Sequence, residues 1–197
     1  MWALHTDGEK GKDMRVIAGS ARRIQLQTPQ GMETRPTTDR IKETLFNMLQ
    51  SSLYDCSFLD LFSGSGAIGI EALSRGAKEA CFVEQGTEAI RCIQKNLKNT
   101  KLSDTATVLQ MDVTTAIERL ERESRQFDIV FMDPPYRQDW ERIVLVRLRN
   151  SGLVHTQTQF IFEAALDTDL TGIEQLGYEI VKIKKYKTNM HVFLSLA

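Results

Sequence analysis

The segment from Phe127 to Tyr136, FDIVFMDPPY, constrains the fold most strongly, because an apolar run typical of a buried strand ends abruptly at two prolines. Proline has no N–H to donate to a sheet ladder, and its ring fixes φ at about −65°. Pro134 also favours an extended conformation at Asp133. The segment therefore holds a carboxylate, free carbonyl groups and an aromatic ring at the carboxyl end of a strand, the edge at which open α/β sheets bind ligands.

The tetrapeptide Asp133-Pro134-Pro135-Tyr136 suits an exocyclic amine on a planar base. The Asp133 carboxylate and the Pro134 carbonyl can both accept hydrogen bonds, and the Tyr136 ring offers a stacking surface. The alternative is a strand end followed by an ordinary turn, which two prolines alone would favour. The complete tetrapeptide favours the amine site and resembles the (Asn/Asp)-Pro-Pro-(Tyr/Phe/Trp) motif of S-adenosylmethionine-dependent amino-methyltransferases. Those enzymes methylate N6 of adenine, N2 of guanine or a glutamine amide.

A glycine-rich loop lies between a predicted strand at 58–62 and a predicted helix at 67–75. Gly64, Gly66 and Gly69 give the pattern G-x-G-x-x-G. These glycines allow a tight turn and a close approach of a ligand to the backbone. The pattern alone is a weak signal, because dinucleotide oxidoreductases and methyltransferases share it.

Three acidic residues stand near the ends of predicted strands. Asp60 lies beside the glycine loop, and Glu84 ends the strand at 80–83, 18 residues after Gly66. An acid at that position typically accepts hydrogen bonds from ribose hydroxyls. Asp112 follows the strand at 106–109, where it can accept from an adenine amino group or simply cap the helix predicted at 114–122.

The order of these elements predicts a doubly wound, mostly parallel seven-stranded α/β sheet. The resemblance to amino-methyltransferases implies that this sheet is of the Rossmann-like class I methyltransferase type. Five strands alternate with helices, the last of them a short helix around 170–176, and an antiparallel pair at 178–186 and 190–196 closes the sheet. In such a sheet the glycine loop meets three other motifs at one edge. These are Glu84, Asp112 and the Asp-Pro-Pro-Tyr tetrapeptide. A nicotinamide-dependent enzyme would explain only the glycine loop and Glu84, whereas an S-adenosylmethionine enzyme uses all four motifs.

An N-terminal β-hairpin and helix precede the sheet. Residues 14–17 and 23–27 read as the hairpin, and Thr37 or Thr38 as the N-cap of a helix whose N-terminus could receive a carboxylate. Between residues 14 and 42 six basic residues face two acidic ones, Glu33 and Asp39, for a local net charge of +4. The basic residues are Arg15, Arg22, Arg23, Arg35, Arg40 and Lys42. This patch fits either phosphate binding or a solvated surface.

Bulk properties exclude several classes of protein. The chain has 197 residues and a net charge of −1, so it has no global basic field for nucleic acid. Its three cysteines form no C-x-x-C pair and its histidines are scattered, which predicts no metal site. Since no apolar stretch reaches the length of a membrane span, we expect a cytoplasmic protein.

Residues 1–13 read as a disordered leader or a non-native remnant, 14–52 as an RNA-binding extension and 53–197 as the methyltransferase domain.

Two longer runs resemble the RsmD family, whose members methylate N2 of a guanine in small-subunit (16S) ribosomal RNA. They are RPTTDRIKETLFN at 35–47 and LDLFSGSGAIGIEALSRGA at 59–77, and the MRVIAG opening at Met14 also matches the family start. The resemblance extends from Met14 to the C-terminus. The terminal hairpin departs from it, because Tyr186-Lys187-Thr188-Asn189 replaces the usual Tyr-Gly-x-Thr.

The resemblance implies S-adenosylmethionine as methyl donor, S-adenosylhomocysteine as product, and no metal. It implies that catalysis is carried by Asp133, Pro134, Pro135 and Tyr136. It implies cofactor contacts by Asp60, Phe62, Gly64, Ser65, Gly66, Glu84, Gln85, Asp112, Val113 and Thr37. It implies RNA contacts by Arg15, Arg22, Arg23, Arg35 and Arg40. The expected partner is ribosomal RNA in a small-subunit particle or assembly intermediate, the enzyme acting as a monomer away from membranes.

Three other functions stay open from the sequence. An adenine-N6 methyltransferase acting on DNA or RNA would share the Asp-Pro-Pro-Tyr corner, although so short a chain leaves little room for a DNA-reading domain. A nicotinamide-dependent oxidoreductase would bind NADH and not S-adenosylmethionine. A non-catalytic RNA-binding module with a vestigial pocket is disfavoured by the intact set of motifs.

Overall fold

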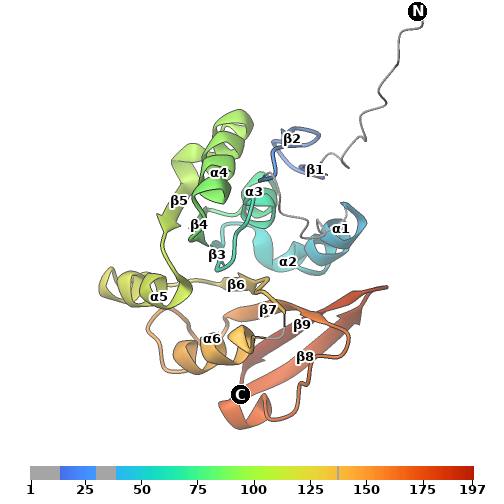
Figure 1. Cartoon of the computed structure of the whole chain (residues 1–197), viewed down its shortest axis with the longest axis vertical. Coiled ribbons are helices and arrows are strands. Elements are labelled where there is room, and N and C mark those ends of the chain that lie inside the picture. Colours follow the sequence, from blue (N-terminus) through green and yellow to red (C-terminus); the bar gives the residue numbers. More distant parts are fainter. Residues whose placement is uncertain (1–13, 30–38, 137) are drawn as a thin grey trace, which may run out of the picture.

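The computed structural model describes residues 14–29, 39–136 and 138–197, and its centre is one seven-stranded sheet (Figure 1). The strand order is β5-β4-β3-β6-β7-β9-β8. The strands are β3 Ser57–Asp60, β4 Glu79–Glu84, β5 Ala106–Gln110, β6 Ile129–Met132, β7 Gln159–Ala165, β8 Tyr178–Lys185 and β9 Asn189–Leu196. Strands β3 to β7 pair in parallel, whereas β9 pairs antiparallel with both β7 and β8. The predicted doubly wound sheet with a terminal hairpin is confirmed.

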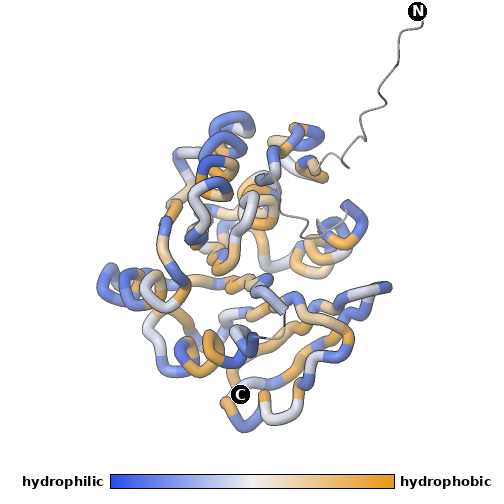
Figure 2. Tube along the Cα trace, in the orientation of Figure 1, coloured by the Kyte–Doolittle hydropathy of each residue, from blue (hydrophilic) through white to orange (hydrophobic). Residues whose placement is uncertain are grey.

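Helices cover both faces of this sheet. One hydrophobic cluster takes residues from α5 and α6, and the other from the four helices that precede them. The helices are α1 Asp39–Met48, α2 Gln50–Leu53, α3 Ala67–Ser74, α4 Thr87–Thr100, α5 Val113–Arg122 and α6 Trp140–Leu148. Successive strand residues enter opposite clusters, as Phe58 and Leu59 do, because side chains alternate across a strand. Figure 2 shows the hydrophobic residues concentrated on the central strands.

The chain before the sheet forms a short hairpin that packs on α3. Strands β1 Met14–Arg15 and β2 Gln25–Leu26 pair antiparallel, so the predicted hairpin is confirmed with a shorter ladder. Val16 and Leu26 share a hydrophobic cluster with α1 and α3. The hairpin and the sheet therefore have one continuous core.

Two local predictions need correction. The helix expected near 170–176 is only a 3-10 turn, η2 Glu174–Leu176. Asp169 accepts the Thr171 amide at 2.9 Å, and Gly172 has φ +79°, so the backbone turns there and cannot propagate a helix. Lys42 was counted in the basic patch, but it is buried and lies 3.4 Å from Glu71.

The region that the structure describes contains no helix long and apolar enough to cross a membrane.

Candidate active site

The four predicted motifs follow four neighbouring strands, β5, β4, β3 and β6. Because these strands run parallel, their carboxyl ends meet at one edge of the sheet. Strand β6 is apolar along its whole length, and each of its residues is at most 1% exposed. It ends where Asp133-Pro134 begins, which places the Asp-Pro-Pro-Tyr corner beside the glycine loop that follows β3.

Glu84 joins the glycine loop to the loop after β4. Its Oε2 accepts the Gly64 amide at 2.9 Å, and its Oε1 accepts the Gly86 amide at 2.7 Å. A carboxylate has about four acceptor positions, so two stay available for ribose hydroxyls. Gly69 is required by packing, because a Cβ there would lie 2.3 Å from the Phe82 ring.

Asp60 is a buried carboxylate whose acceptors are only half used. Its Oδ2 accepts the Gly69 amide at 3.3 Å, whereas its Oδ1 has no hydrogen-bond partner among the described residues. Burial raises the pKa of Asp60 to about 7, and the nearby charge of Glu84 acts in the same direction. An unpartnered buried acceptor beside the glycine loop fits a cationic donor, and S-adenosylmethionine carries an ammonium group.

Asp112 caps helix α5, which was the alternative interpretation of this residue. Its Oδ1 accepts the amides of Thr114 and Thr115, both at 3.0 Å. Hydrogen bonds from the Thr114 and Thr115 hydroxyls, together with these amide bonds, hold the pKa of Asp112 well below its usual range. The side chain is exposed at the same sheet edge. Its contact with an adenine amine stays a prediction.

The remaining cofactor candidates differ in exposure. Gln85 is exposed, Ser65 is partly buried, and Val113, the first residue of α5, is buried in the core. Phe62 is partly buried and contacts the Trp140 ring edge-on, with centroids 6.1 Å apart. Thr37 lies outside the described residues.

The Asp-Pro-Pro-Tyr corner combines a desolvated carboxylate with an exposed ring. Asp133 is half-buried, Pro134 is buried, and Tyr136 is 45% exposed. Burial raises the pKa of Asp133 well above its ordinary value, and the charges of Glu163 and Asp60 raise it further.

Sequence reasoning missed Glu163, a residue of β7 that accepts a hydrogen bond from the Tyr136 hydroxyl at 2.9 Å. The available signal was a carboxylate inside the otherwise apolar run QFIFEAA. Such a residue has to be paired, and the sequence does not name its partner.

Most of the predicted RNA-contacting residues are on the surface. Arg15, Arg22, Arg23 and Arg40 are exposed, whereas Arg35 lies outside the described residues. Arg15 pairs with Asp39 at 2.9 Å, and an exposed pair of this kind is weak enough for a phosphate to replace it.

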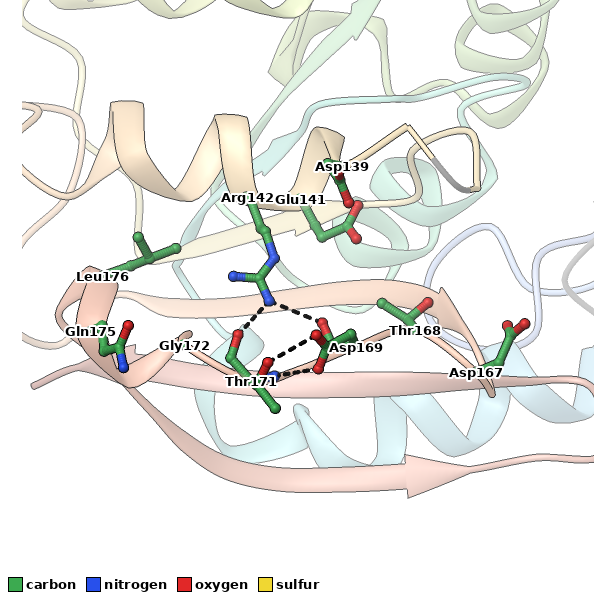
Figure 3. A pocket seen from close by; sticks show the side chains of 10 residues that line it. All are labelled: Asp139, Glu141, Arg142, Asp167, Thr168, Asp169, Thr171, Gly172, Gln175 and Leu176. Atoms are coloured by element: carbon green, nitrogen blue, oxygen red, sulfur yellow. Dashed lines mark hydrogen bonds between the residues drawn. The ribbon is translucent and has the colours of Figure 1, made fainter.

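A pocket of about 680 Å³ lies away from these motifs, between the start of α6 and the segment before η2 (Figure 3). Asp139, Glu141, Asp167 and Asp169 line it, and Arg142 reaches across to the Asp169 and Thr171 carbonyls. Its lining includes none of the predicted site residues among those described. The acidic walls make it unsuitable for a phosphate or an RNA backbone.

Within residues 14–29, 39–136 and 138–197, no group of three or more His, Cys, Asp or Glu residues is arranged to hold a metal ion. The strand order, the glycine loop, the acid after β4 and the Asp-Pro-Pro-Tyr corner together define an S-adenosylmethionine-dependent methyltransferase.

The family follows from comparison with known proteins. The model of the family described as "Conserved hypothetical protein 95" matches residues 14–195. "Ribosomal RNA small subunit methyltransferase D" of Escherichia coli K12 is 34% identical over 157 residues, which cover 80% of this chain and 77% of the relative. Its namesake in Haemophilus influenzae is 38% identical over 137 residues, covering 69% and 70%. A solved Escherichia coli protein, yhhF, superposes with a TM-score of 0.81 and 29% identity, covering 93% of this chain and 98% of that one.

The chain belongs to the Conserved hypothetical protein 95 family, which is the RsmD family, and the resemblance inferred from its motifs is confirmed.

Proposed function

We propose that this protein transfers the methyl group of S-adenosylmethionine to the exocyclic N2 amine of a guanine in small-subunit (16S) ribosomal RNA. The observation that carries the proposal is the Asp-Pro-Pro-Tyr corner beside the glycine loop at one sheet edge. Relatives named small-subunit ribosomal RNA methyltransferases support the RNA as substrate. Guanine N2 is the acceptor that the family resemblance implies.

Three residues of the corner have distinct roles in this proposal. The Asp133 carboxylate and the Pro134 carbonyl accept hydrogen bonds from the target amine and hold its lone pair toward the methyl group. Bound S-adenosylmethionine supplies an activated methyl sulfonium. The Tyr136 ring stacks on the flipped base, which returns about 1–3 kcal/mol against the cost of unstacking.

Asp133 also suits the proton transfer that the reaction needs. When N2 bonds to the methyl carbon, the bond from that carbon to sulfur breaks, and the positively charged amine then loses a proton. A carboxylate whose pKa is raised by burial and by neighbouring negative charges takes that proton more readily than an ordinary aspartate.

The basic surface of the N-terminal extension supports a large RNA substrate. Arg15, Arg22, Arg23 and Arg40 are exposed there, and their affinity for phosphates would fall steeply with salt. A ribosomal particle or assembly intermediate as partner, a monomeric enzyme and a cytoplasmic location complete the proposal.

The decisive experiment is transfer of labelled methyl to small-subunit particles from cells that lack the endogenous enzyme, followed by nucleoside analysis. Label in N2-methylguanosine is expected. Label in N6-methyladenosine would keep the chemistry of the corner and overturn the acceptor. NADH binding without S-adenosylmethionine binding would overturn the class of enzyme.

Asp133→Ala tests the role of the carboxylate within the same assay. Transfer should fall by at least about a thousandfold, because both the hydrogen bond to the amine and the proton acceptor are lost. Affinity for S-adenosylhomocysteine, measured by calorimetry, should stay near that of the wild type. A parallel loss of cofactor affinity would assign Asp133 a structural role instead.

A further inference from the structure

Glu163 connects the Asp-Pro-Pro-Tyr corner to the C-terminal hairpin. The carboxylate is 6% exposed and lies opposite His191 in the β7–β9 register. Its Oε1 accepts the Tyr136 hydroxyl at 2.9 Å and the Asn189 side-chain amide at 2.6 Å. Its Oε2 lies 3.2 Å from Nε2 of His191. Three side chains from two other parts of the chain therefore converge on one buried carboxylate.

A second layer supports this carboxylate. His191 is fully buried, and its Nδ1 lies 3.1 Å from the Tyr186 hydroxyl. Because Nε2 donates to Glu163, a neutral imidazole leaves Nδ1 to accept from Tyr186. The His191 ring also meets the edges of Tyr186 and Phe131, with centroids 5.1 and 6.2 Å away. Hydrogen bonds thus run without interruption from Tyr186 to Tyr136.

The network is costly to build, and the sheet itself does not require it. A carboxylate buried in a central strand loses its hydration, and an apolar side chain at that position would pack without this cost. The three hydrogen bonds lower the pKa of Glu163 against the effect of burial, so the side chain stays ionised. Tyr136, by contrast, is 45% exposed and follows two prolines. Its hydroxyl bond to Glu163 restricts the rotation of the tyrosine ring.

We propose that Glu163 is a positioning residue for methyl transfer: with Asn189 and His191 it holds the Tyr136 hydroxyl, and so fixes the ring that stacks on the target base. This role rests on the proposed function of the Asp-Pro-Pro-Tyr corner. It also gives a task to Asn189, which stands where the family usually has threonine. The alternative is that the same bonds only fasten β9 to β7.

A double-mutant cycle separates these two roles. Glu163→Asp keeps the charge but shortens the reach, and Tyr136→Phe removes only the hydroxyl. Each single change should lower kcat for particle methylation about tenfold, the effect of losing one charge-assisted hydrogen bond. The double variant should be no slower than either single variant, because both changes remove the same contact. KM for the particles and affinity for S-adenosylhomocysteine should not change.

Two control variants make the outcome decisive. Glu179→Asp on the exposed side of β8 should leave kcat unchanged. Tyr186→Phe removes only the outermost bond and should lower kcat about threefold in the wild type and not at all in the Tyr136→Phe background. Tyr186→Phe replaces Glu163→Asp in the cycle if Glu163→Asp does not fold.

Independent losses would overturn the positioning role. A double variant about a hundredfold slower than the wild type, or a lowered melting temperature with kcat unchanged, would show that Glu163 only fastens strands. A wild-type enzyme that does not form N2-methylguanosine would instead refute the proposed function, and the two failures are therefore distinguishable.

Discussion

The two hairpins of this protein are attached to the same sheet in different ways. Strands β8 and β9 have eight residues each, and β9 continues the backbone ladder of β7. Strands β1 and β2 have two residues each and, among the residues that the structure describes, pair only with one another. So short a ladder leaves backbone groups unpaired, and burying them without partners would be costly. Side chains from α3 and α4 supply the missing partners.

Glu71 and Ser74 of α3 hold the N-terminal hairpin. Glu71 is fully buried and accepts the amides of Ile17 at 2.8 Å and Ala18 at 3.0 Å. The Ser74 hydroxyl accepts the Ala21 amide at 2.9 Å and donates to the Ala18 carbonyl at 2.6 Å. The backbone of this hairpin is therefore held on α3 mostly by side chains, with one backbone bond from the Ser20 amide to the Ser74 carbonyl at 2.8 Å. The C-terminal hairpin, in contrast, is held by the backbone ladder between β7 and β9.

The hairpins also reach opposite halves of the site. Asn96 of α4 bonds Gln27 near the end of the N-terminal hairpin and also donates to the Ser65 carbonyl in the glycine loop, at 2.9 Å. Glu163 links the C-terminal hairpin to Tyr136. The half of the site at the glycine loop (the cofactor half) and the half at Tyr136 (the base half) thus have separate supports. A mutation can remove either support without removing the other.

Glu71→Ala should break the N-terminal attachment most severely. It removes the acceptor for two backbone amides and leaves Lys42, which is 1% exposed, without its carboxylate. Removing one partner of a buried ion pair costs about 3–5 kcal/mol, and urea unfolding should show a loss of that size. Glu88→Ala, at an exposed pair on α4, should change the free energy of unfolding by less than about 0.5 kcal/mol. Equal effects would contradict the side-chain attachment.

Asp60 contrasts with Glu163, because one of its oxygens has no hydrogen-bond partner in the described part of the chain and its pKa is raised to about 7. The folded state then keeps a proton between pH 4 and 7 that the unfolded chain releases. This stabilisation is complete below pH 4 and is lost as the pH rises to 7, by about 4 kcal/mol for a shift of about three units.

Asp60→Asn cannot titrate and should lack this loss. Urea unfolding at pH 4.5 and 7.5 would compare the two proteins, with Asp104→Asn as an exposed control. Parallel pH profiles for the wild type and Asp60→Asn would refute a raised pKa.

Gly19→Ala should loosen the same hairpin from the backbone side. Gly19 has φ +84°, and a Cβ there would lie 1.7 Å from the Ser74 carbonyl oxygen. The backbone strain and the displaced contact should lower the free energy of unfolding by about 2 kcal/mol, as measured by thermal or urea unfolding. Gly152→Ala is the matched control, since a Cβ at Gly152 would meet nothing within 4 Å. A neutral Gly19→Ala would show that the hairpin does not depend on this close approach.

Asn96→Ala should give the smallest effect and the most specific one. The glycine loop loses its bond at the Ser65 carbonyl, so affinity for S-adenosylhomocysteine should fall about tenfold in calorimetry. Asn99→Ala, exposed on the same helix, should bind normally. If the rate from bound cofactor also fell in Asn96→Ala, the separation between cofactor half and base half would be wrong.

Much of the fold could be predicted because its signals are local. The apolar run of β6 ends at two prolines, and the glycine loop stands between a strand and a helix, so both were placed from the sequence. The helix predicted at 170–176 is wrong, because the backbone turns at the bond between Asp169 and Thr171 and at the positive φ of Gly172. Lys42 was misread because its charge gave no sign of burial.

The sequence by itself determined the order of the functional motifs along the chain. A glycine loop comes first, then an acid, then Asp-Pro-Pro-Tyr, and each stands at the end of a strand. These assignments depend on turns and periodicity within a few residues of each motif. Only the tertiary structure decided what pairs with the buried charges. Glu71 meets residues 17 and 18, and Glu163 meets residues 136, 189 and 191, because parallel crossovers and the antiparallel closing strand bring distant segments together. A buried charge shows in sequence that a partner is needed, and only the fold supplies it.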